Sequence, residues 1–423
     1  RKMLITEDNI KRYILTHIEG KHPPKETLFN YRLKNNSKYL KQLNAQYVKS
    51  FNKNTVVFIS DRPNFFFLRV SKALMDKGVN TVLLTRWGVD KGHSNYFNEV
   101  FLFNSLLDLY LLSHIKDVYI YVQSWVGWFF LPVFVDLITK SQVYCNVNDS
   151  SVLLFDEISS FNKIGINKDS AVLDIECEIY IYENLNLVTH PYKDINLINN
   201  MSVRGGLHYF PCYPLKEFIY NINNPILDKT ELVFIGGIPY DKKDDLVFED
   251  AKMHNVAKII IKQKLHLTIL NNPLLTQSEC DIAYKYLFFS DLSKNNSNFN
   301  FSSGYPPWEI HEYTQNFSYG IMIYDFSNIL VSRLHTQSIV PTKFFTYIEL
   351  GLPVIVIDEM EAVSKIVKDN NIGIVVNWSE VDSLSEIIEQ NKISYFNYRQ
   401  SVNSYALKHS MQKMLLNISS FLM

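Results

Sequence analysis

The chain has 423 residues, of which 47% are hydrophobic and 20% are charged. This composition excludes a disordered or fibrous protein, and the length suits two domains of roughly 200 residues each better than a single hydrophobic core. Basic and acidic side chains nearly cancel, 42 against 43, so the net charge gives no reason to expect nucleic-acid binding or a polybasic membrane anchor.

Cysteine spacing and hydropathy bound the setting further. Four cysteines lie far apart, without the spacing of a zinc site or a disulfide scaffold, so we expect reduced and buried thiols at Cys145, Cys177, Cys212 and Cys280. No apolar run approaches the ~20 residues of a membrane-spanning helix. The first residues lack the apolar stretch of a signal peptide, so we expect a cytoplasmic protein.

The first half of the chain alternates strands with helices after a polar start. Residues 1–54 are rich in Lys and Asn and predict a helical or irregular lead-in rather than a domain. The next predicted elements are strand 55–60, helix 65–78, strand 80–85, strand 99–103, helix 105–115, strand 117–122, helix 126–139, strand 142–147, a helix and strand over 171–190, and a strand within 208–214. Apolar strands between helices indicate a parallel sheet covered on both faces, so residues 55–214 predict a Rossmann-like domain.

A second series of the same kind follows a polar segment, 215–229, that predicts an interdomain linker. Its predicted elements are strand 231–237, helix 247–264, strand 265–270, helix 278–289, strand 298–301, helix 307–316, strand 320–324, helix 341–350, strand 353–357, helix 360–370, strand 372–376 and helices 380–390 and 395–421. Residues 230–394 therefore predict a second Rossmann-like domain, and residues 395–423 a terminal helix able to cross back to the first. Because parallel sheets bind ligands beyond the carboxyl ends of their strands, we expect sites on opposite walls of one interdomain cleft.

Residues 341–356, PTKFFTYIELGLPVIV, form the most informative segment. They predict a helix that opens with proline, ends at Gly351 and leads directly into a buried strand. Unpaired N–H groups and the positive end of the dipole allow a helix start to bind phosphate, and Thr342 and Lys343 would add a hydroxyl group and a charge. The alternative is an ordinary helix–strand unit in which Lys343 is a solvated surface residue.

This segment resembles the Pro-Ser/Thr-Lys-x-x-Glu-Tyr-x-x-x-Gly-x-Pro-Val-Ile signature in the carboxyl domain of GT-B glycosyltransferases, and residues 362–374 resemble their next helix and strand. The resemblance implies an α/β fold of two Rossmann-like domains (GT-B) with an interdomain cleft. It also implies that the helix start contacts the donor diphosphate and that a glutamate within the helix binds the ribose. Thr346 stands in that position here and is a weaker acceptor than a carboxylate, while Glu349 lies one turn later.

The resemblance extends by strand order over about residues 55–423, with motif similarity in roughly the last hundred. The donor-binding residues that it and the sequence pattern predict are Gly236, Gly237, Gly304, Tyr305, Arg333, Pro341, Thr342, Lys343 and Thr346. Gly236 and Gly237 end a strand and are equally compatible with a simple turn. Tyr305 is also compatible with packing, and Arg333, in an irregular segment, with a solvated surface position. Lys242 and Lys243 lie slightly too far beyond the glycine pair for the basic side chain that GT-B enzymes often add there.

A catalytic base is expected on a loop of the amino domain, because inverting transfer requires a carboxylate or imidazole near the acceptor hydroxyl. The candidates, which are equally compatible with cap, turn or surface roles, are Asp61, His93 and Asp149. Residues 123–125, Gln-Ser-Trp, carry no histidine where some retaining relatives have one. A donor phosphate can itself guide the acceptor proton in retaining enzymes, so the stereochemistry stays open.

Metal and sugar contacts complete the expected site. No Asp-x-Asp motif occupies a strand-end loop, and neither residues 244–245 nor residues 174–178 have a supporting context, so we predict metal independence and no cofactor besides the donor. Trp87, Trp125 and Trp128 fall in or beside amino-domain loops. They are compatible with stacking on sugar rings and with core packing.

The resulting hypothesis is a glycosyltransferase that moves a sugar from a nucleotide-sugar donor to a hydroxyl acceptor, which is a saccharide, a lipid-linked molecule or a protein. By resemblance, the setting is bacterial surface polysaccharide or glycoprotein glycan assembly, with peripheral association at the inner face of the cytoplasmic membrane and no nucleic-acid partner. Two alternatives share the architecture: a nucleotide-sugar epimerase and a non-catalytic GT-B subunit that stabilises an active partner. The missing ribose glutamate supports the second of these.

Overall fold

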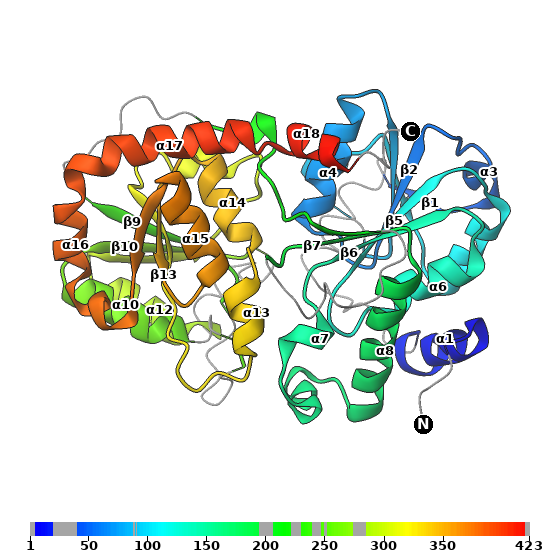
Figure 1. Cartoon of the computed structure of the whole chain (residues 1–423), viewed down its shortest axis with the longest axis horizontal. Coiled ribbons are helices and arrows are strands. Elements are labelled where there is room, and N and C mark those ends of the chain that lie inside the picture. The colour runs from blue at the N-terminus through cyan, green and yellow to red at the C-terminus, as the bar shows by residue number, and fades with distance from the viewer. Residues whose placement is uncertain are drawn as a thin grey trace. The chain divides into compact units, whose positions relative to one another are not determined.

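A computed structural model describes residues 5–19, 40–87, 89, 91–193, 206–220, 230–238, 247–248, 252–273 and 285–418. The chain divides into two compact units, one of Arg1–Cys212 with Met414–Met423 and one of Tyr213–Lys413 (Figure 1). The sequence predicted domains at 55–214 and 230–394. Lys242, Lys243, the pair at 244–245, Cys280 and most of the expected linker lie outside the described residues.

The first unit is built on a parallel sheet with the strand order β1-β4-β3-β2-β5-β6-β7-β8. Its strands are β1 (Leu40–Gln42), β2 (Thr55–Ser60), β3 (Asn80–Thr85), β4 (Glu99–Leu102), β5 (Tyr119–Ser124), β6 (Gln142–Val147), β7 (Leu187–His190) and β8 (Leu207–Tyr209). Every residue of β2 is buried, as expected for a strand covered on both faces. Strands β3 and β4 are added on one side of β2 and strands β5 to β8 on the other, so the strand order reverses between β2 and β5. Open parallel sheets bind ligands at such a point.

Helices cover both faces of this sheet and carry the loops of interest. They are α3 (Ala45–Val48), α4 (Phe65–Met75), α5 (Lys91–Ser94), α6 (Phe130–Ile138), α7 (Ser151–Leu154) and α8 (Lys168–Asn184), with 3₁₀ segments η3 (Leu106–His114) and η4 (Ile158–Ile164). Helix α6 packs on β5, β6 and α8. In the described part of the chain, Cys145, Cys177 and Cys212 are buried and form no disulfide bond, as predicted.

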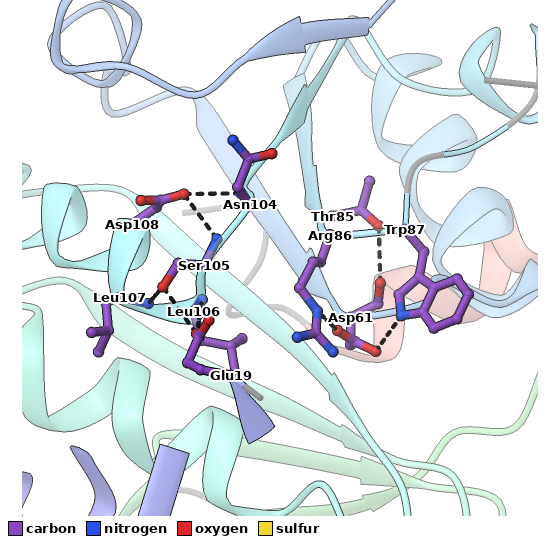
Figure 2. Close-up of polar contacts among 10 residues, drawn as sticks. All are labelled: Glu19, Asp61, Thr85, Arg86, Trp87, Asn104, Ser105, Leu106, Leu107 and Asp108. Carbon is purple, nitrogen blue, oxygen red and sulfur yellow. Dashed lines mark hydrogen bonds and ion pairs between the residues drawn. The ribbon is translucent and has the colours of Figure 1, made fainter. Parts of the chain in front are cut away.

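The described residues before residue 55, which are 5–19 and 40–54, belong to the first compact unit. Helix α1 (Glu7–Tyr13) packs on α6, η1 (Ile14–Ile18) continues it, and β1 pairs in parallel with β4. Glu19 holds the start of η3: its Oε1 accepts hydrogen bonds from the Ser105 hydroxyl at 2.9 Å and the Leu106 N–H at 2.8 Å (Figure 2). These contacts span more than eighty residues, so local sequence pattern does not reveal them.

The second unit contains a six-stranded parallel sheet in the order β11-β10-β9-β12-β13-β14. Its strands are β9 (Glu231–Gly236), β10 (His266–Asn271), β11 (Phe299–Ser303), β12 (Tyr319–Met322), β13 (Val354–Ile357) and β14 (Gly373–Val376). The helices and 3₁₀ segments are η5 (Lys216–Phe218), α10 (Met253–Lys262), α12 (Leu287–Asn295), η7 (Ile310–Tyr313), α13 (Arg333–Ser338), α14 (Thr342–Glu349), α15 (Glu361–Asn370), η8 (Trp378–Ser383), α16 (Leu384–Gln390), η9 (Lys392–Ser394) and α17 (Tyr395–Lys408). The direction change here falls between β9 and β12.

Three predicted elements of the carboxyl-terminal half were wrong. The expected helix 307–316 is only the short η7, and the segment before α14 is not irregular, because Ser332 caps α13 by accepting the Leu334 N–H at 3.1 Å. The expected helix 395–421 ends at Lys408, and α18 (Met411–Met414) and η10 (Leu415–Asn417) follow. The helix does not continue there, and the Met411 N–H instead donates to the Pro214 carbonyl at 2.7 Å. In the described parts of the chain, no helix combines the length and apolar character needed to cross a membrane.

Candidate active site

The carboxyl edge of the second sheet brings together Gly236 and Lys343, two of the predicted donor-binding residues. Gly236 ends β9, and Lys343 lies in the first turn of α14. A Cβ atom added to Gly236 would lie 3.1 Å from Cε and 3.2 Å from Nζ of Lys343, so the glycine leaves room for the cation. Gly237 follows directly in the loop.

Lys343 is partly buried rather than a solvated surface residue. Its Nζ donates to the Tyr324 hydroxyl at 2.8 Å and lies 4.6 Å from the ring centroid of Phe234. Pro341 precedes the helix, no side chain among the described residues caps the start of α14, and Thr342 is exposed. A fixed ammonium group and the start of an eight-residue helix therefore occupy the same edge of the sheet, an arrangement suited to an anion.

The contacts of Thr346 and Glu349 show whether either residue could take the place of the ribose-binding glutamate of the signature. The Thr346 hydroxyl donates to the Thr342 carbonyl at 3.3 Å, within its own helix. Glu349 is 2% exposed, and its Oε1 accepts the Leu215 N–H at 2.8 Å, while its carbonyl accepts the Tyr220 N–H at 2.8 Å. Glu349 thus holds the chain segment that enters the second unit and does not replace the carboxylate that Thr346 lacks.

Gly304 and Asn271 form a second contact point on this edge. The Gly304 N–H donates to the Asn271 carbonyl at 2.6 Å, and a Cβ at Gly304 would lie 2.7 Å from that oxygen, so only glycine fits. Asn271 is fully buried and its Oδ1 accepts the Ile238 N–H at 2.8 Å, whereas Nδ2 has no hydrogen-bond partner in the described part of the chain. The sequence prediction missed Asn271, although a polar residue at the end of an apolar strand was the available signal.

The remaining donor candidates have other contacts. Tyr305 stacks on Tyr313 with ring centroids 3.5 Å apart, which fits the packing interpretation. Arg333 belongs to α13 and pairs with Glu359 at 2.9 Å, with its side chain 52% exposed. Their donor-binding roles stay predictions.

In the first unit, Asp61 lies directly after β2 with both carboxylate oxygens in use (Figure 2). Oδ1 accepts from Arg86 Nε at 2.6 Å and Oδ2 from Trp87 Nε1 at 2.9 Å, and the Thr85 hydroxyl donates to the Asp61 carbonyl at 3.2 Å. The side chain is 4% exposed. Burial raises the pKa of Asp61, and the Arg86 charge opposes that rise. The hydrogen bonds from Arg86 and Trp87 favour the ionised carboxylate, which weakens Asp61 as a proton acceptor.

His93 is also enclosed. It lies in the short helix α5, is 6% exposed, and its ring stacks between Phe65 and Phe97 at centroid distances of 5.9 and 6.0 Å. This environment is that of a packed aromatic cluster.

Asp149 differs from both. It follows β6, is partly buried, and its carboxylate forms no hydrogen bond or ion pair with a residue that the structure describes. Burial raises its pKa to about 6. A carboxylate with open oxygens and a pKa near neutrality has the properties of a general base.

Two buried carboxylates on α8 fix the loops that follow β5 and β6. Asp174 accepts the N–H groups of Gly127 at 2.6 Å and Phe129 at 2.9 Å, and the Ser151 hydroxyl at 2.5 Å. Burial raises the pKa of Asp174 to about 6. This residue therefore shapes the loop that carries Trp125 and Trp128.

Glu178, one turn further along α8, acts in the same way on the next loop. It accepts hydrogen bonds from the Ser150 hydroxyl, from the Val152 N–H at 2.9 Å and from the Tyr182 hydroxyl at 2.7 Å. Burial raises the pKa of Glu178 to about 7. The sequence pattern raised residues 174–178 only as possible metal ligands, but the contacts of Asp174 and Glu178 show that they position the backbone around Asp149. No group of three or more potential metal ligands gathers among the described residues, and metal independence stays a prediction.

Comparisons with known structures agree with the GT-B fold that the sequence resemblance implied. Sucrose-phosphate synthase from Thermosynechococcus elongatus is 12% identical and has a TM-score of 0.57, with 87% of this chain and 98% of that chain covered. HepE from Anabaena in complex with UDP-glucose is 10% identical and has a TM-score of 0.56, with 87% of this chain and 99% of that chain covered. A glycosyltransferase from Rickettsia africae is 11% identical and has a TM-score of 0.56, with 88% of this chain and 99% of that chain covered. The protein therefore has the two-unit GT-B fold of these enzymes, as predicted.

Residues 270–413 match the family model described as "Glucosyltransferase 3-like, C-terminal domain". The second unit thus carries a glucosyltransferase 3-like carboxyl-terminal domain, and this match together with the fold supports a glycosyltransferase. No curated protein sequence matches the chain.

Proposed function

We propose that the protein transfers a sugar from a nucleotide-sugar donor to a hydroxyl acceptor, and that it uses no metal ion or other cofactor. The observation that carries the proposal is Lys343, held against Gly236 at the start of α14, where the donor diphosphate would meet a fixed positive charge. The fold neighbour HepE was solved with UDP-glucose, which adds support for a donor of this class.

In the proposed reaction, the acceptor oxygen attacks the anomeric carbon of the donor. A new carbon–oxygen bond forms while the bond to the diphosphate oxygen breaks, and the leaving nucleoside diphosphate takes the electron pair. Lys343 and the N-terminal turn of α14 stabilise the negative charge that develops there. Asn271 Nδ2 is available to donate to a donor oxygen on the same edge.

Asp149 accepts the acceptor proton in this scheme. Of the three candidates, it is the one whose carboxylate or imidazole is neither covered by hydrogen-bond donors nor enclosed by aromatic rings. A protein base on this loop corresponds to transfer with inversion at the anomeric carbon.

By resemblance, the acceptor is a saccharide, a lipid-linked molecule or a protein in bacterial surface glycan assembly at the inner face of the cytoplasmic membrane. The family model and the fold neighbours give no support to the epimerase and non-catalytic alternatives.

Donor binding provides the test. Thermal unfolding is measured with UDP-, GDP-, TDP-, ADP- and CMP-sugars, where a ligand at 100 times its Kd stabilises the folded state by about 2.7 kcal/mol. One donor should raise the melting temperature, and Lys343→Gln should weaken its binding about tenfold. The matched control is Lys365→Gln, a 60% exposed lysine in α15 of the same unit, which should bind as the unaltered protein does. The proposal fails if no nucleotide sugar stabilises the protein or if Lys343→Gln behaves like the control.

A further inference from the structure

An arginine and tryptophan cluster lies at the carboxyl edge of the first sheet. We define it as Arg62, Arg86, Trp87, Trp125 and Trp128. Arg62 follows β2 and Arg86 follows β3, which is paired with β2 through Ser60 and Thr85, while Trp125 follows β5 on the other side of β2. The cluster thus surrounds the point where the chain reverses direction across the sheet, the usual place for a ligand.

The cluster carries two positive charges, and the neighbouring carboxylate of Asp61 can neutralise only one of them. Asp61 Oδ1 accepts a hydrogen bond from Nε of Arg86 (Figure 2). The two Nη groups of that guanidinium have no hydrogen-bond partner among the described residues. Arg62 is exposed and forms no ion pair within 4 Å in the described part of the chain. Among the described residues, the single carboxylate of Asp61 therefore interacts with two permanently charged arginines.

Both guanidinium groups are held by aromatic rings. The Arg62 Cζ lies 4.4 Å from the Trp87 ring centroid, and the Arg86 Cζ lies 5.6 Å from that of Trp128. Trp87 is itself fixed by its Nε1 bond to Asp61, and the Arg86 side chain is 7% exposed. Because the planar groups are oriented before a ligand arrives, less conformational entropy is lost when their N–H groups bind it.

From this geometry we infer that the acceptor carries a phosphoryl group, which Arg62 and Arg86 bind beside a sugar ring stacked on the tryptophans. This inference rests on the proposed transferase function and specifies its acceptor class. Arginine only donates hydrogen bonds, and its planar fork matches phosphate oxygens, so a neutral saccharide would leave most of these donors and the excess charge unmatched. Trp125 and Trp128, with centroids 5.8 Å apart and both partly exposed, supply apolar faces for the sugar.

The phosphoryl group has two chemical sources, a lipid-linked saccharide diphosphate and a free sugar phosphate. Calorimetric titration in the absence of nucleotide sugar compares glucose and N-acetylglucosamine with their 1-phosphates, with glucuronic acid, and with a short-chain prenyl diphosphate saccharide. A phosphorylated form should bind at least about tenfold more tightly than its neutral parent. Tighter binding of the prenyl compound would assign the lipid-linked source, and equal or tighter binding of the 1-phosphates the soluble one.

Arg62→Gln tests the assignment to the cluster, because Arg62 is exposed and its loss leaves the buried Asp61 and Arg86 pair intact. It should remove the preference for the phosphorylated form, while Lys140→Gln, an exposed cation elsewhere in the first unit, should retain it. Donor-induced thermal stabilisation should be the same in both variants. Equal binding of neutral and phosphorylated sugars, equal binding of glucuronic acid, or loss of donor binding in Arg62→Gln would each overturn the inference. Failure of the proposed function would instead appear as an absence of donor stabilisation in the unaltered protein.

Discussion

The protonation of Asp149 gives a quantitative test of the proposed base. Its carboxylate is the basic form and its pKa is raised to about 6 by burial, so it should titrate just below neutrality in the free protein. Roughly nine-tenths of the molecules would carry the carboxylate at pH 7 and roughly one-tenth at pH 5. We therefore expect kcat/KM for acceptor transfer to fall about tenfold between these values, with an apparent pKa near 6.

Asp149→Asn separates this role from a structural one. The amide keeps the shape of the side chain but accepts no proton, so kcat should fall by a factor of about 10² to 10⁴. The decrease of kcat/KM at acid pH, which is the acid limb of the pH profile, should disappear from the remaining activity. Asp156→Asn, at an exposed site a few residues later, is the control and should keep both rate and limb.

Stability should change in the opposite direction from activity. Because the folded pKa of Asp149 lies above its ordinary value, the group stabilises the fold most when it is protonated, and this contribution is lost as the pH rises through 6. At pH 7 the Asn variant should thus unfold no more easily than the unaltered protein. An Asp149→Asn variant that keeps its kcat and its acid limb, or that loses activity only by unfolding, would refute the role of Asp149 as base.

Two further predictions concern positioning and donor affinity. Asp174→Ala should lower the free energy of unfolding by about 2 to 4 kcal/mol in urea titrations, because it strips the acceptor from two backbone N–H groups, and a loss no larger than that of the exposed Asp169→Ala would contradict this role. Thr346→Glu restores the carboxylate of the family signature and should tighten donor binding by up to about tenfold in calorimetry. Unchanged affinity would mean that the ribose does not reach this face of α14.

The sequence predicted the sheets better than the segments around them. Strands β2, β3 and β6 begin and end as expected because runs of β-branched residues bounded by polar ones suit a strand buried on both faces. The helix at 341–350 was also found, since proline and glycine mark its two ends. By contrast, the role of Glu19 depends on Ser105 and Leu106, which lie far along the chain.

The candidate site was predictable in position but not in side-chain environment. The pattern located Lys343 and Gly236 separately, whereas their proximity follows from how α14 packs against the end of β9. Asp61, His93 and Asp149 are indistinguishable as loop residues, and only their neighbours separate an ion-paired carboxylate, an enclosed imidazole and an open acid. Likewise, the direction in which Glu349 points depends on the backbone of Leu215.

The central claim, transfer from a nucleotide sugar, is tested most directly by incubating the protein with each member of the donor panel and a sugar 1-phosphate acceptor and following the mixture by ¹H and ³¹P NMR. For the donor that binds, we predict release of its nucleoside phosphate together with free sugar or a glycoside of the sugar phosphate acceptor, and loss of this activity in Lys343→Gln. A donor that remains intact, or a nucleotide sugar returned with altered sugar stereochemistry and an unbroken diphosphate, would contradict it.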